Sequence, residues 1–362
     1  MGDLRRQRGG WVCHLLLQKC VKAARLHAYG RPLSLDDVPT PTPGPGEVIV
    51  RIAGSGFCHS DVHVIDGEIK ILPRLPLTLG HENAGFVTAL GTGVRDLREG
   101  DPVLVYGGWG CGTCDHCVVG EEQLCETPKW VGLSEYDGGY AEYLRVPHAR
   151  SLIVLRGIEP RAAAPLADAA LTPYRAIRRA LPYLVPDRPV LVIGLGGLGQ
   201  YGVRLLGLLS GCPIIAVDTN ERKLELARKL GAAHGFRADR PDLVKQILEL
   251  TRRSGVAAAF DFVGSDATLA LSLATTRSGG KVTQIGLAGG TAKMRPLENV
   301  RFEVLFETTL WGTLKELREV VALVESGRLR PFSAEYAPLS QIDEVYRRVK
   351  RGDVENRIVI TP

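Results

Sequence analysis

The chain has 362 residues, of which 45% are hydrophobic and 23% charged, with eight cysteines and a formal net charge of +5. This composition is typical of a globular enzyme of about two domains, and so few cysteines argue against a disulfide-stapled secreted scaffold. We therefore expect a cytoplasmic protein. No apolar run approaches the roughly eighteen residues of a membrane span, and the dispersed basic residues give no reason to expect nucleic acid.

The first twenty residues, 1–20, differ from the rest of the chain. They have a basic start and a short apolar stretch, 11–17, but lack the long apolar region and small-residue cleavage site of a signal peptide. We expect this segment to be an N-terminal extension, either disordered or a start-site artefact. The first strand should begin at Val21.

The remaining chain divides into two parts with different patterns of predicted secondary structure. Residues 21 to about 160 contain short β-branched segments between turn clusters, such as 47–52 after the proline-rich 39–46, which predicts a mostly β unit. From about 171 to 310, strands alternate with helices, and this predicts a parallel, doubly wound sheet. The clearest elements are the strand Val190–Ile193, the helix Leu198–Leu209, the strand Ile214–Val217 and the helix Glu221–Leu230, ended by Gly231. The predicted fold class is therefore α/β with an additional mostly β domain.

Two segments of the β unit contain metal-ligating residue types. The segment 58–63, C-H-S-D-V-H, follows a strand that we expect to end in a turn at 54–56, and 80–82, G-H-E, follows 77–79, L-T-L. A catalytic zinc needs about three protein ligands and keeps one position open for water or substrate. Cys58 and His81 supply two of these ligands.

A second group of cysteines predicts a closed metal site. Within 110–126, four thiols are spaced C-x-x-C-x-x-C with a fourth after seven intervening residues: Cys111, Cys114, Cys117 and Cys125. Four thiolates satisfy tetrahedral zinc and leave no open position, so the site is expected to be structural. Scattered core thiols and disulfides are the alternatives, and the glycine-rich surroundings and the overall composition disfavour them.

A glycine-rich turn opens the α/β half. It follows the strand at 190–193 directly and reads G-x-G-G-x-G, with Gly194, Gly196, Gly197 and Gly199. These glycines suit a tight turn in contact with a dinucleotide pyrophosphate. Asp218, 24 residues after Gly194, ends the next strand and is placed to bind both ribose hydroxyls and repel a 2′-phosphate, which favours NAD. The alternative is a packing turn with an incidental acid; Lys223 either flanks the ribose or is a solvated lysine.

Together these motifs resemble the zinc-dependent medium-chain alcohol dehydrogenases, over nearly all of 21–362. The resemblance places the third catalytic zinc ligand at Asp168, where animal-type enzymes have cysteine and a bacterial group acting on secondary alcohols has aspartate. It implies a GroES-like catalytic domain at 21–170 and 311–362, with a zinc lobe at 110–126, and a Rossmann NAD-binding domain at 171–310. The active site would lie between the two domains.

The resemblance also implies a mechanism. A zinc ion with an open position lowers the pKa of a bound alcohol, and the zinc-bound alkoxide transfers a hydride to nicotinamide C4. Ser60 would touch the substrate oxygen and pass the proton through the cofactor ribose to His63 at the surface. Asp61 would orient the ligand His81, and Glu82 would sit behind the zinc. Taken alone, His63 would more often be a surface or hydrogen-bonded histidine, and the alternative for Glu82 is a plain salt bridge.

The remaining assignments concern the cofactor and the substrate. His59 and Arg357 match positions that hold the pyrophosphate, Thr172 lies beside the nicotinamide in the family, and Ile285 and Leu287 should pack near that ring. Trp109 and Trp311 are candidates for an apolar substrate pocket, although large aromatic residues are as often core.

The resemblance predicts an NAD-dependent, zinc-dependent alcohol dehydrogenase with two zinc ions per chain, acting on a small alcohol or ketone. Secondary alcohols are favoured over the alternative of a polyol or primary alcohol, and a homotetramer over a dimer. A zinc-free quinone or enoyl reductase would lack Cys58, His81 and the cysteine lobe. A non-catalytic NADH-binding or zinc-storing protein would be expected to have lost Ser60 or a catalytic ligand.

Overall fold

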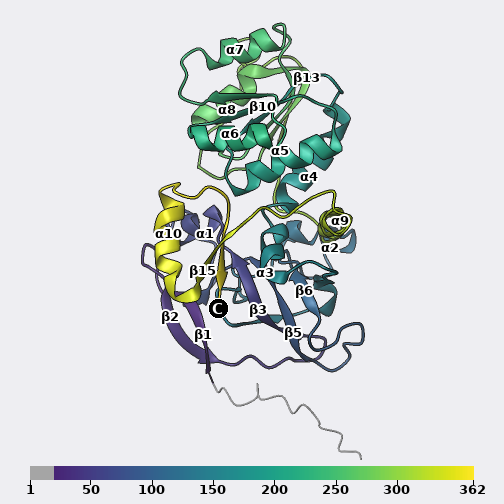
Figure 1. Ribbon diagram of the computed structural model, residues 1–362, viewed down its shortest axis with the longest axis vertical. Helices are drawn as coiled ribbons and strands as arrows, with labels where there is room; N and C mark the ends of the chain where they lie inside the picture. Colours follow the sequence, from purple (N-terminus) through teal and green to yellow (C-terminus); the bar gives the residue numbers. More distant parts are fainter. Residues whose placement is uncertain (1–19) are drawn as a thin grey trace, which may run out of the picture.

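The computed structural model describes residues 20–362, and its ribbon falls into two lobes (Figure 1). The predicted extension, 1–20, lies outside the described residues except for Cys20, which begins the first strand. That strand, β1, was expected to begin at Val21 and therefore agrees with the prediction to within one residue.

The lower lobe in Figure 1 is built on two β-sheets. The larger has the order β15-β16-β3-β5-β6-β8, with β7 also paired to β3. Its strands are β3 (Val48–Gly56), β5 (Glu82–Leu90), β6 (Pro102–Val105), β7 (Tyr143–Val146), β8 (Leu152–Val154), β15 (Glu335–Pro338) and β16 (Ile358–Thr361). The smaller, ordered β2-β1-β4, contains β1 (Cys20–Leu26), β2 (Ser34–Pro39) and β4 (Leu77–Thr78).

One prediction for this lobe was wrong. Residues 54–56 do not form a turn, because β3 continues through Gly56 and pairs with β5 up to that residue. A Cβ on Gly54 would lie 2.6 Å from Val359 Cγ1, and one on Gly56 would lie 1.9 Å from Glu82 Oε2. These glycines are required by close packing within the sheet rather than by a turn.

The upper lobe contains one parallel sheet with the order β11-β10-β9-β12-β13-β14. Its strands are β9 (Val190–Ile193), β10 (Ile214–Asp218), β11 (His234–Arg237), β12 (Val256–Asp261), β13 (Thr276–Gln284) and β14 (Leu305–Thr308). Every residue of β9 is buried, as expected for a central strand covered by helices on both faces. The predicted doubly wound sheet is confirmed, and its strand order reverses direction between β9 and β12.

Ten α-helices complete the described part of the chain. They are α1 (His59–Asp66), α2 (Asp115–Val118), α3 (Pro160–Ala163), α4 (Leu171–Ala180), α5 (Gly197–Leu209), α6 (Glu221–Lys229), α7 (Leu243–Leu250), α8 (Asp266–Thr275), α9 (Leu314–Glu325) and α10 (Ile342–Lys350). Both α9 and α10 follow the parallel sheet in sequence but pack on the lower lobe (Figure 1). In residues 20–362, no helix is both long and apolar enough to cross a membrane.

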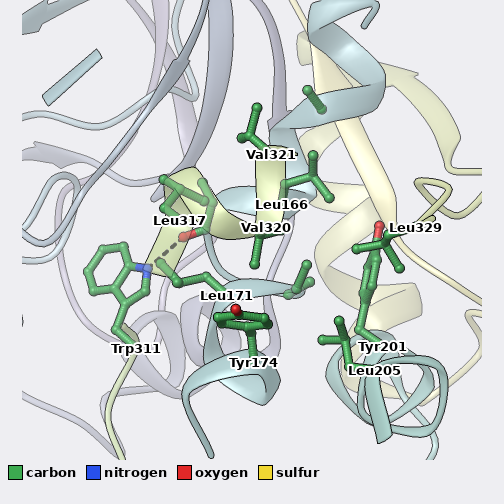
Figure 2. Close-up of a cluster of buried hydrophobic side chains, with 14 of the residues drawn as sticks. Leu166, Leu171, Tyr174, Tyr201, Leu205, Trp311, Leu317, Val320, Val321 and Leu329 are labelled. Carbon is green, nitrogen blue, oxygen red and sulfur yellow. Dashed lines mark hydrogen bonds between the residues drawn. The ribbon is translucent and has the colours of Figure 1, made fainter. Parts of the chain in front are cut away.

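The two lobes share a hydrophobic core at their junction. Figure 2 shows Leu171 and Tyr174 of α4 near Leu317 and Val320 of α9, and Tyr201 of α5 further along the same cluster, beside Leu329. The predicted domain boundary at 170/171 falls at the first residue of α4, the helix that contributes to this junction. Residues on both sides of that boundary are thus held by one apolar cluster.

Candidate functional site

Four buried side chains form a candidate metal centre. One ligand atom from each of Cys58, His81, Glu82 and Asp168 lies within 4.8 Å of the others. Cys58 caps the N-terminus of α1 directly after β3, and His81 and Glu82 lie where β5 begins. Asp168 follows the short 3-10 helix η4 (Ala164–Ala167) and precedes α4. The fold therefore brings together ligands that are up to 110 residues apart.

The three predicted zinc ligands converge on one point. Asp168 Oδ2 lies 3.6 Å from Cys58 Sγ and 3.5 Å from His81 Nε2. The other oxygen of this carboxylate accepts a hydrogen bond from the Thr172 hydroxyl. A thiol, an imidazole nitrogen and a carboxylate form a donor set that suits zinc and leaves one coordination position open.

Electrostatic interactions favour the charged forms of His81 and Asp168, and a bound metal ion would displace the His81 proton, because a ligand imidazole is neutral. Burial by itself disfavours charge, but Asp61 and Asp168 together hold the pKa of His81 well above its usual value. Burial likewise opposes ionisation of Asp168, yet His81 and Arg357 bring the pKa of this carboxyl below its usual range. Asp168 is therefore a carboxylate, the form that binds a metal ion.

The second nitrogen of His81 faces Asp61. Asp61 Oδ1 lies 3.4 Å from His81 Nδ1, and the carboxylate is fully buried. Its Oδ2 accepts hydrogen bonds from the Cys58 N–H at 3.1 Å and from the Tyr140 hydroxyl at 2.7 Å. This arrangement supports the predicted role of Asp61 in orienting a metal-binding histidine.

Glu82 is held by Arg357. The guanidinium group donates to both carboxylate oxygens of Glu82, and its Nη2 lies 3.8 Å from Asp168 Oδ2. Burial raises the pKa of Glu82 to about 7, although Arg357 opposes the shift. Arg357 was predicted to contact a cofactor pyrophosphate, and it also lies beside the glycine turn, because a Cβ on Gly197 would be 3.0 Å from its Nη1. This one arginine therefore connects the candidate metal centre to the candidate cofactor site.

The four cysteines of the lobe at 110–126 form the second candidate metal centre. Cys111 Sγ lies 4.0 Å from Cys117 Sγ, and Cys114 Sγ lies 3.8 Å from Cys125 Sγ. Four sulfurs at about 2.3 Å from a tetrahedral zinc ion would be about 3.8 Å apart, whereas a disulfide would bring two to about 2.05 Å. Hydrogen bonds from the Thr113 side chain and from backbone N–H groups lower the pKa of Cys111 to about 5. The geometry fits a closed zinc site.

The glycine turn lies at the carboxyl end of β9, beside the point where the sheet order reverses. Gly194 has a φ of +84°, and a Cβ on Gly199 would lie 1.8 Å from the Gly194 carbonyl oxygen. A Cβ on Gly196 would meet no atom within 4 Å, so the backbone there is open to a ligand. This is the arrangement expected of a dinucleotide-binding turn.

Asp218 is placed beside this turn. Its Oδ2 accepts a hydrogen bond of 2.7 Å from the Leu195 N–H, and its Oδ1 accepts one of 2.9 Å from the Asn220 N–H. Lys223 lies in the next helix, α6, and lowers the pKa of His59, after the larger effects of desolvation, His63 and Arg357. Lys223 and Arg357 thus both act on His59, and Arg357 lies beside the turn, where a positive charge suits a pyrophosphate.

Both predicted relay residues lie on α1. Ser60 Oγ is 3.6 Å from Cys58 Sγ, next to the metal centre. His63 is one helical turn further on, and its Nδ1 lies 2.5 Å from Glu68 Oε2. The imidazole of His63 also packs edge-on against that of His59, with ring centroids 5.1 Å apart.

The aromatic and apolar candidates separate into two groups. Trp311 packs edge-on against His81, with ring centroids 5.7 Å apart. Of the two residues expected near the nicotinamide ring, Ile285 is buried and Leu287 is exposed. In contrast, Trp109 is 0% exposed and donates a hydrogen bond to the Tyr106 carbonyl within the core. The geometry therefore gives no support to Trp109 as a substrate-pocket residue.

Three residues that we did not predict support the site or lie in the elements that position it. Tyr140 binds Asp61, and Gln200 Nε2 donates to the carbonyls of Leu195 at 3.0 Å and Glu355 at 2.6 Å, which ties the glycine turn to the segment before Arg357. Arg175 lies one turn after Thr172 in α4. None of the three belongs to a recognisable short motif, so no signal in the sequence marks them.

Comparison with known proteins agrees with this geometry. Residues 44–156 match the model of the alcohol dehydrogenase GroES-like domain, and 197–326 match that of zinc-binding dehydrogenases. An NAD-dependent alcohol dehydrogenase of Sulfurisphaera tokodaii is 36% identical over 351 residues, which cover 94% of this chain and 100% of the relative.

Solved structures are similar over the same span. An alcohol dehydrogenase of the archaeon Aeropyrum pernix is 42% identical with a TM-score of 0.88, covering 94% of this chain and 100% of that one. An acetophenone reductase of Geotrichum candidum, solved with NAD, is 31% identical with a TM-score of 0.83, covering 95% and 98%. The chain thus belongs to the zinc-binding alcohol dehydrogenase family, with a GroES-like domain and a dinucleotide-binding domain.

Proposed function

We propose that this protein is an NAD(H)-dependent, zinc-dependent alcohol dehydrogenase that interconverts secondary alcohols and ketones. The observation that carries the proposal is the position of Arg357 between the metal centre and the glycine turn. Because one side chain reaches both, a cofactor bound at the turn would lie next to a substrate bound at the metal centre. Hydride transfer needs this proximity.

The chain provides a place for each cofactor. Cys58, His81 and Asp168 would hold the catalytic zinc, and the four lobe cysteines the structural zinc. Asp218, with the turn at 194–199, would bind the adenosine ribose and pyrophosphate of NAD and disfavour the 2′-phosphate of NADP. When bound, zinc supplies Lewis-acid polarisation of the substrate oxygen, and NAD supplies the hydride acceptor.

The residues of α1 would carry the proton. Ser60 lies beside the metal centre, where its hydroxyl can accept a hydrogen bond from a substrate hydroxyl. His63 lies three residues later, on the same side of the helix, and pairs with Glu68 near the surface. The relay would therefore run from Ser60, beside the metal centre, to His63, whose side chain is partly exposed and pairs with Glu68.

A preference for secondary alcohols is supported by the apolar wall beside the metal centre. Trp311 is held there by a hydrogen bond of 2.7 Å from its indole N–H to the Ala167 carbonyl (Figure 2). The similarity to acetophenone reductase, named for a ketone, points in the same direction. We retain a polyol or primary alcohol as the second substrate class to be tested.

We also propose a cytoplasmic homotetramer, with a dimer as the alternative. Large apolar side chains are exposed along 287–310, around the edge strand β14: Leu287, Met294, Leu297, Phe302, Leu305 and Leu310. An exposed apolar edge of this kind suits contact with another subunit. Light scattering on the purified protein gives the number of subunits directly.

Zinc analysis combined with an activity scan tests the enzyme proposal. The wild type should contain about two zinc ions per chain and reduce NAD with propan-2-ol or 1-phenylethanol. Cys58→Ser should remove turnover and lower the content of the catalytic zinc, whereas Cys111→Ser should lower the content of the other zinc and the thermal stability. Cys212→Ser changes a buried cysteine outside both clusters and serves as the control.

Two results would reject the proposal. The first is a folded wild type with two zinc ions that turns over no secondary alcohol, primary alcohol or polyol with either cofactor. The second is a Cys58→Ser variant with undiminished turnover. A higher kcat/KM with polyols or primary alcohols than with secondary alcohols would replace only the substrate class.

A further inference from the structure

Arg175 is a buried charge with no part in the mechanism above. It lies in α4 and is only 5% exposed. Its Nη2 donates to Glu121 Oε1 at 2.9 Å, and its Nη1 donates to Glu316 Oε2 at 3.1 Å. A single guanidinium group therefore joins three segments of the chain, which its fixed, planar set of donors makes possible.

The first of these segments is the cysteine lobe. Glu121 lies between Cys117 and Cys125, within the loop that closes the four-cysteine cluster. Its N–H donates to the His116 carbonyl at 2.8 Å, and its Oε2 lies 3.6 Å from His116 Nδ1. The position of Glu121 thus depends on the conformation of the metal-binding loop.

The second segment begins α9. Glu316 Oε2 also accepts a hydrogen bond from the Thr313 N–H at 2.8 Å, and the Glu316 N–H donates to the Thr313 hydroxyl oxygen at 3.1 Å; together these two bonds form the N-terminal capping box of the helix. Trp311, two residues before this cap, has a φ of +49° and packs against His81. Arg175 therefore helps to fix the segment that covers a predicted zinc ligand.

The third segment is the first turn of α4 itself. Thr172 lies three residues before Arg175. Its hydroxyl donates to the Asp168 carboxylate, and its N–H donates to the Asp168 backbone carbonyl at 2.9 Å. Figure 2 shows Leu171 and Tyr174, from the same turns of α4, packed near Trp311 and Leu317. A shift of this turn would move the Asp168 carboxylate relative to Cys58 and His81.

We propose that Arg175 is a positioning residue that couples the cysteine lobe to the catalytic centre, with Glu121 as its partner on the lobe. The inference rests on the proposed function, because it assigns Asp168 to the catalytic zinc. A displacement of about 1 Å at reacting groups can reduce turnover about 100-fold, so a lobe that holds no reacting group can still affect the rate. The coupling is mechanical, through a hydrogen-bonded ion pair and one rigid helix turn.

The test compares Arg175→Met, Arg175→Lys and Glu121→Gln with the control Arg178→Met. Arg178 is exposed on the same helix, with its guanidinium over the Tyr174 ring, and contacts neither metal centre. We would measure kcat with propan-2-ol and its 2-deuterated form, the dissociation constant of NADH, and zinc release to a chromophoric chelator. The release phase that changes in Asp168→Asn identifies the catalytic zinc.

For Arg175→Met we expect kcat to fall about tenfold, a larger deuterium isotope effect, faster release of the catalytic zinc, and unchanged NADH binding. Arg175→Lys should be intermediate, because one ammonium group cannot reproduce the forked contact with both carboxylates. Glu121→Gln should change in the same direction, and Arg178→Met should match the wild type.

Each outcome separates the inference from the function on which it rests. An inactive wild type rejects the proposed function. An active wild type, with a folded Arg175→Met variant whose kcat, isotope effect and zinc release are unchanged, overturns the inference and leaves the function standing. If Arg175→Met does not fold, Glu121→Gln decides: unchanged turnover and unchanged release of the catalytic zinc would overturn the coupling.

Discussion

The Tyr140 hydroxyl donates a hydrogen bond of 2.7 Å to Asp61 Oδ2, while the other oxygen of this carboxylate lies 3.4 Å from His81 Nδ1. Tyr140 is fully buried and stacks on Phe57, with ring centroids 5.4 Å apart. The carboxylate that orients a predicted zinc ligand is thus itself held in place by a phenol.

Tyr140→Phe tests this support with the loss of one oxygen atom. A hydrogen bond to a charged group contributes about 1.5–3 kcal/mol, and changes around metal-binding histidines typically alter affinity or activity by about 10–100-fold. We expect kcat to fall at least about tenfold or the catalytic zinc to be released faster by a similar factor. The measurements are steady-state kinetics and chelator-driven zinc release.

Tyr346→Phe is the matched control for Tyr140→Phe. The Tyr346 hydroxyl donates to Asp66 between α10 and α1, in the same lobe but outside the metal centre. Equal effects of the two substitutions on zinc release would show that Tyr140 has no specific role at His81.

Ser60→Ala tests the proton path. Positioned acid-base groups contribute about 10²–10⁴-fold to rate, so kcat should fall about 100-fold while both zinc ions remain bound. Zinc content is measured together with kcat, and Ser326→Ala, at the exposed end of α9, is the control. A loss of zinc in Ser60→Ala would mean that Ser60 supports the metal centre instead of carrying the proton.

Asp218→Gly tests cofactor selection. Removal of a carboxylate that would repel a 2′-phosphate should shift the ratio of kcat/KM for NAD over NADP by about tenfold or more toward NADP, equivalent to about 1.4 kcal/mol. The control is Asp187→Gly, before β9 at the opposite end of the strand, where a φ of +67° accepts glycine without strain. An unchanged ratio in Asp218→Gly would remove Asp218 from the ribose site.

Glu307→Gln tests a buried ion pair that is independent of either metal centre. Glu307, on β14, accepts from Arg179 and contacts the ammonium group of Lys281, which is 2% exposed. Burial acts to raise the pKa of Glu307, but hydrogen bonds from Arg179 and Lys281 outweigh it and the pKa is lowered. Its ionised form therefore stabilises the fold at neutral pH. Replacing Glu307 with a neutral residue would leave the buried ammonium group of Lys281 without its opposite charge.

The sign of the pH dependence follows from that lowered pKa. The stabilisation is complete above the unfolded-state pKa of Glu307 and is lost as the pH falls through its folded-state pKa. Glu307→Gln should thus lower the free energy of unfolding by about 2 kcal/mol at pH 7, with a smaller difference near pH 4. Denaturant unfolding measures this, and Glu298→Gln, in an exposed pair with Arg295, should change it by less than about 1 kcal/mol. A difference that grows toward pH 4 would contradict the assignment.

The fold was largely predictable because its elements carry local patterns. The buried strand at 190–193 and the glycine turn after it were recognised from consecutive residues, and the structure places them as expected. The one misplaced turn, at 54–56, shows where such reasoning stops. Glycine there allows close packing against Val359 and Glu82, which are distant in sequence, and a local pattern cannot distinguish that need from a turn.

The sequence by itself determined the chemistry of the cysteine lobe, the glycine turn and the cofactor acid, because thiol spacing and turn geometry are local properties, whereas the third ligand of the catalytic centre, Asp168, came from the family resemblance. Only the tertiary structure decided what holds these groups in place. Tyr140 is 79 residues from Asp61, and Arg175 is 54 residues from Glu121 and 141 from Glu316. Such contacts depend on how sheets and helices pack, and the residue types involved occur throughout the chain without a characteristic spacing.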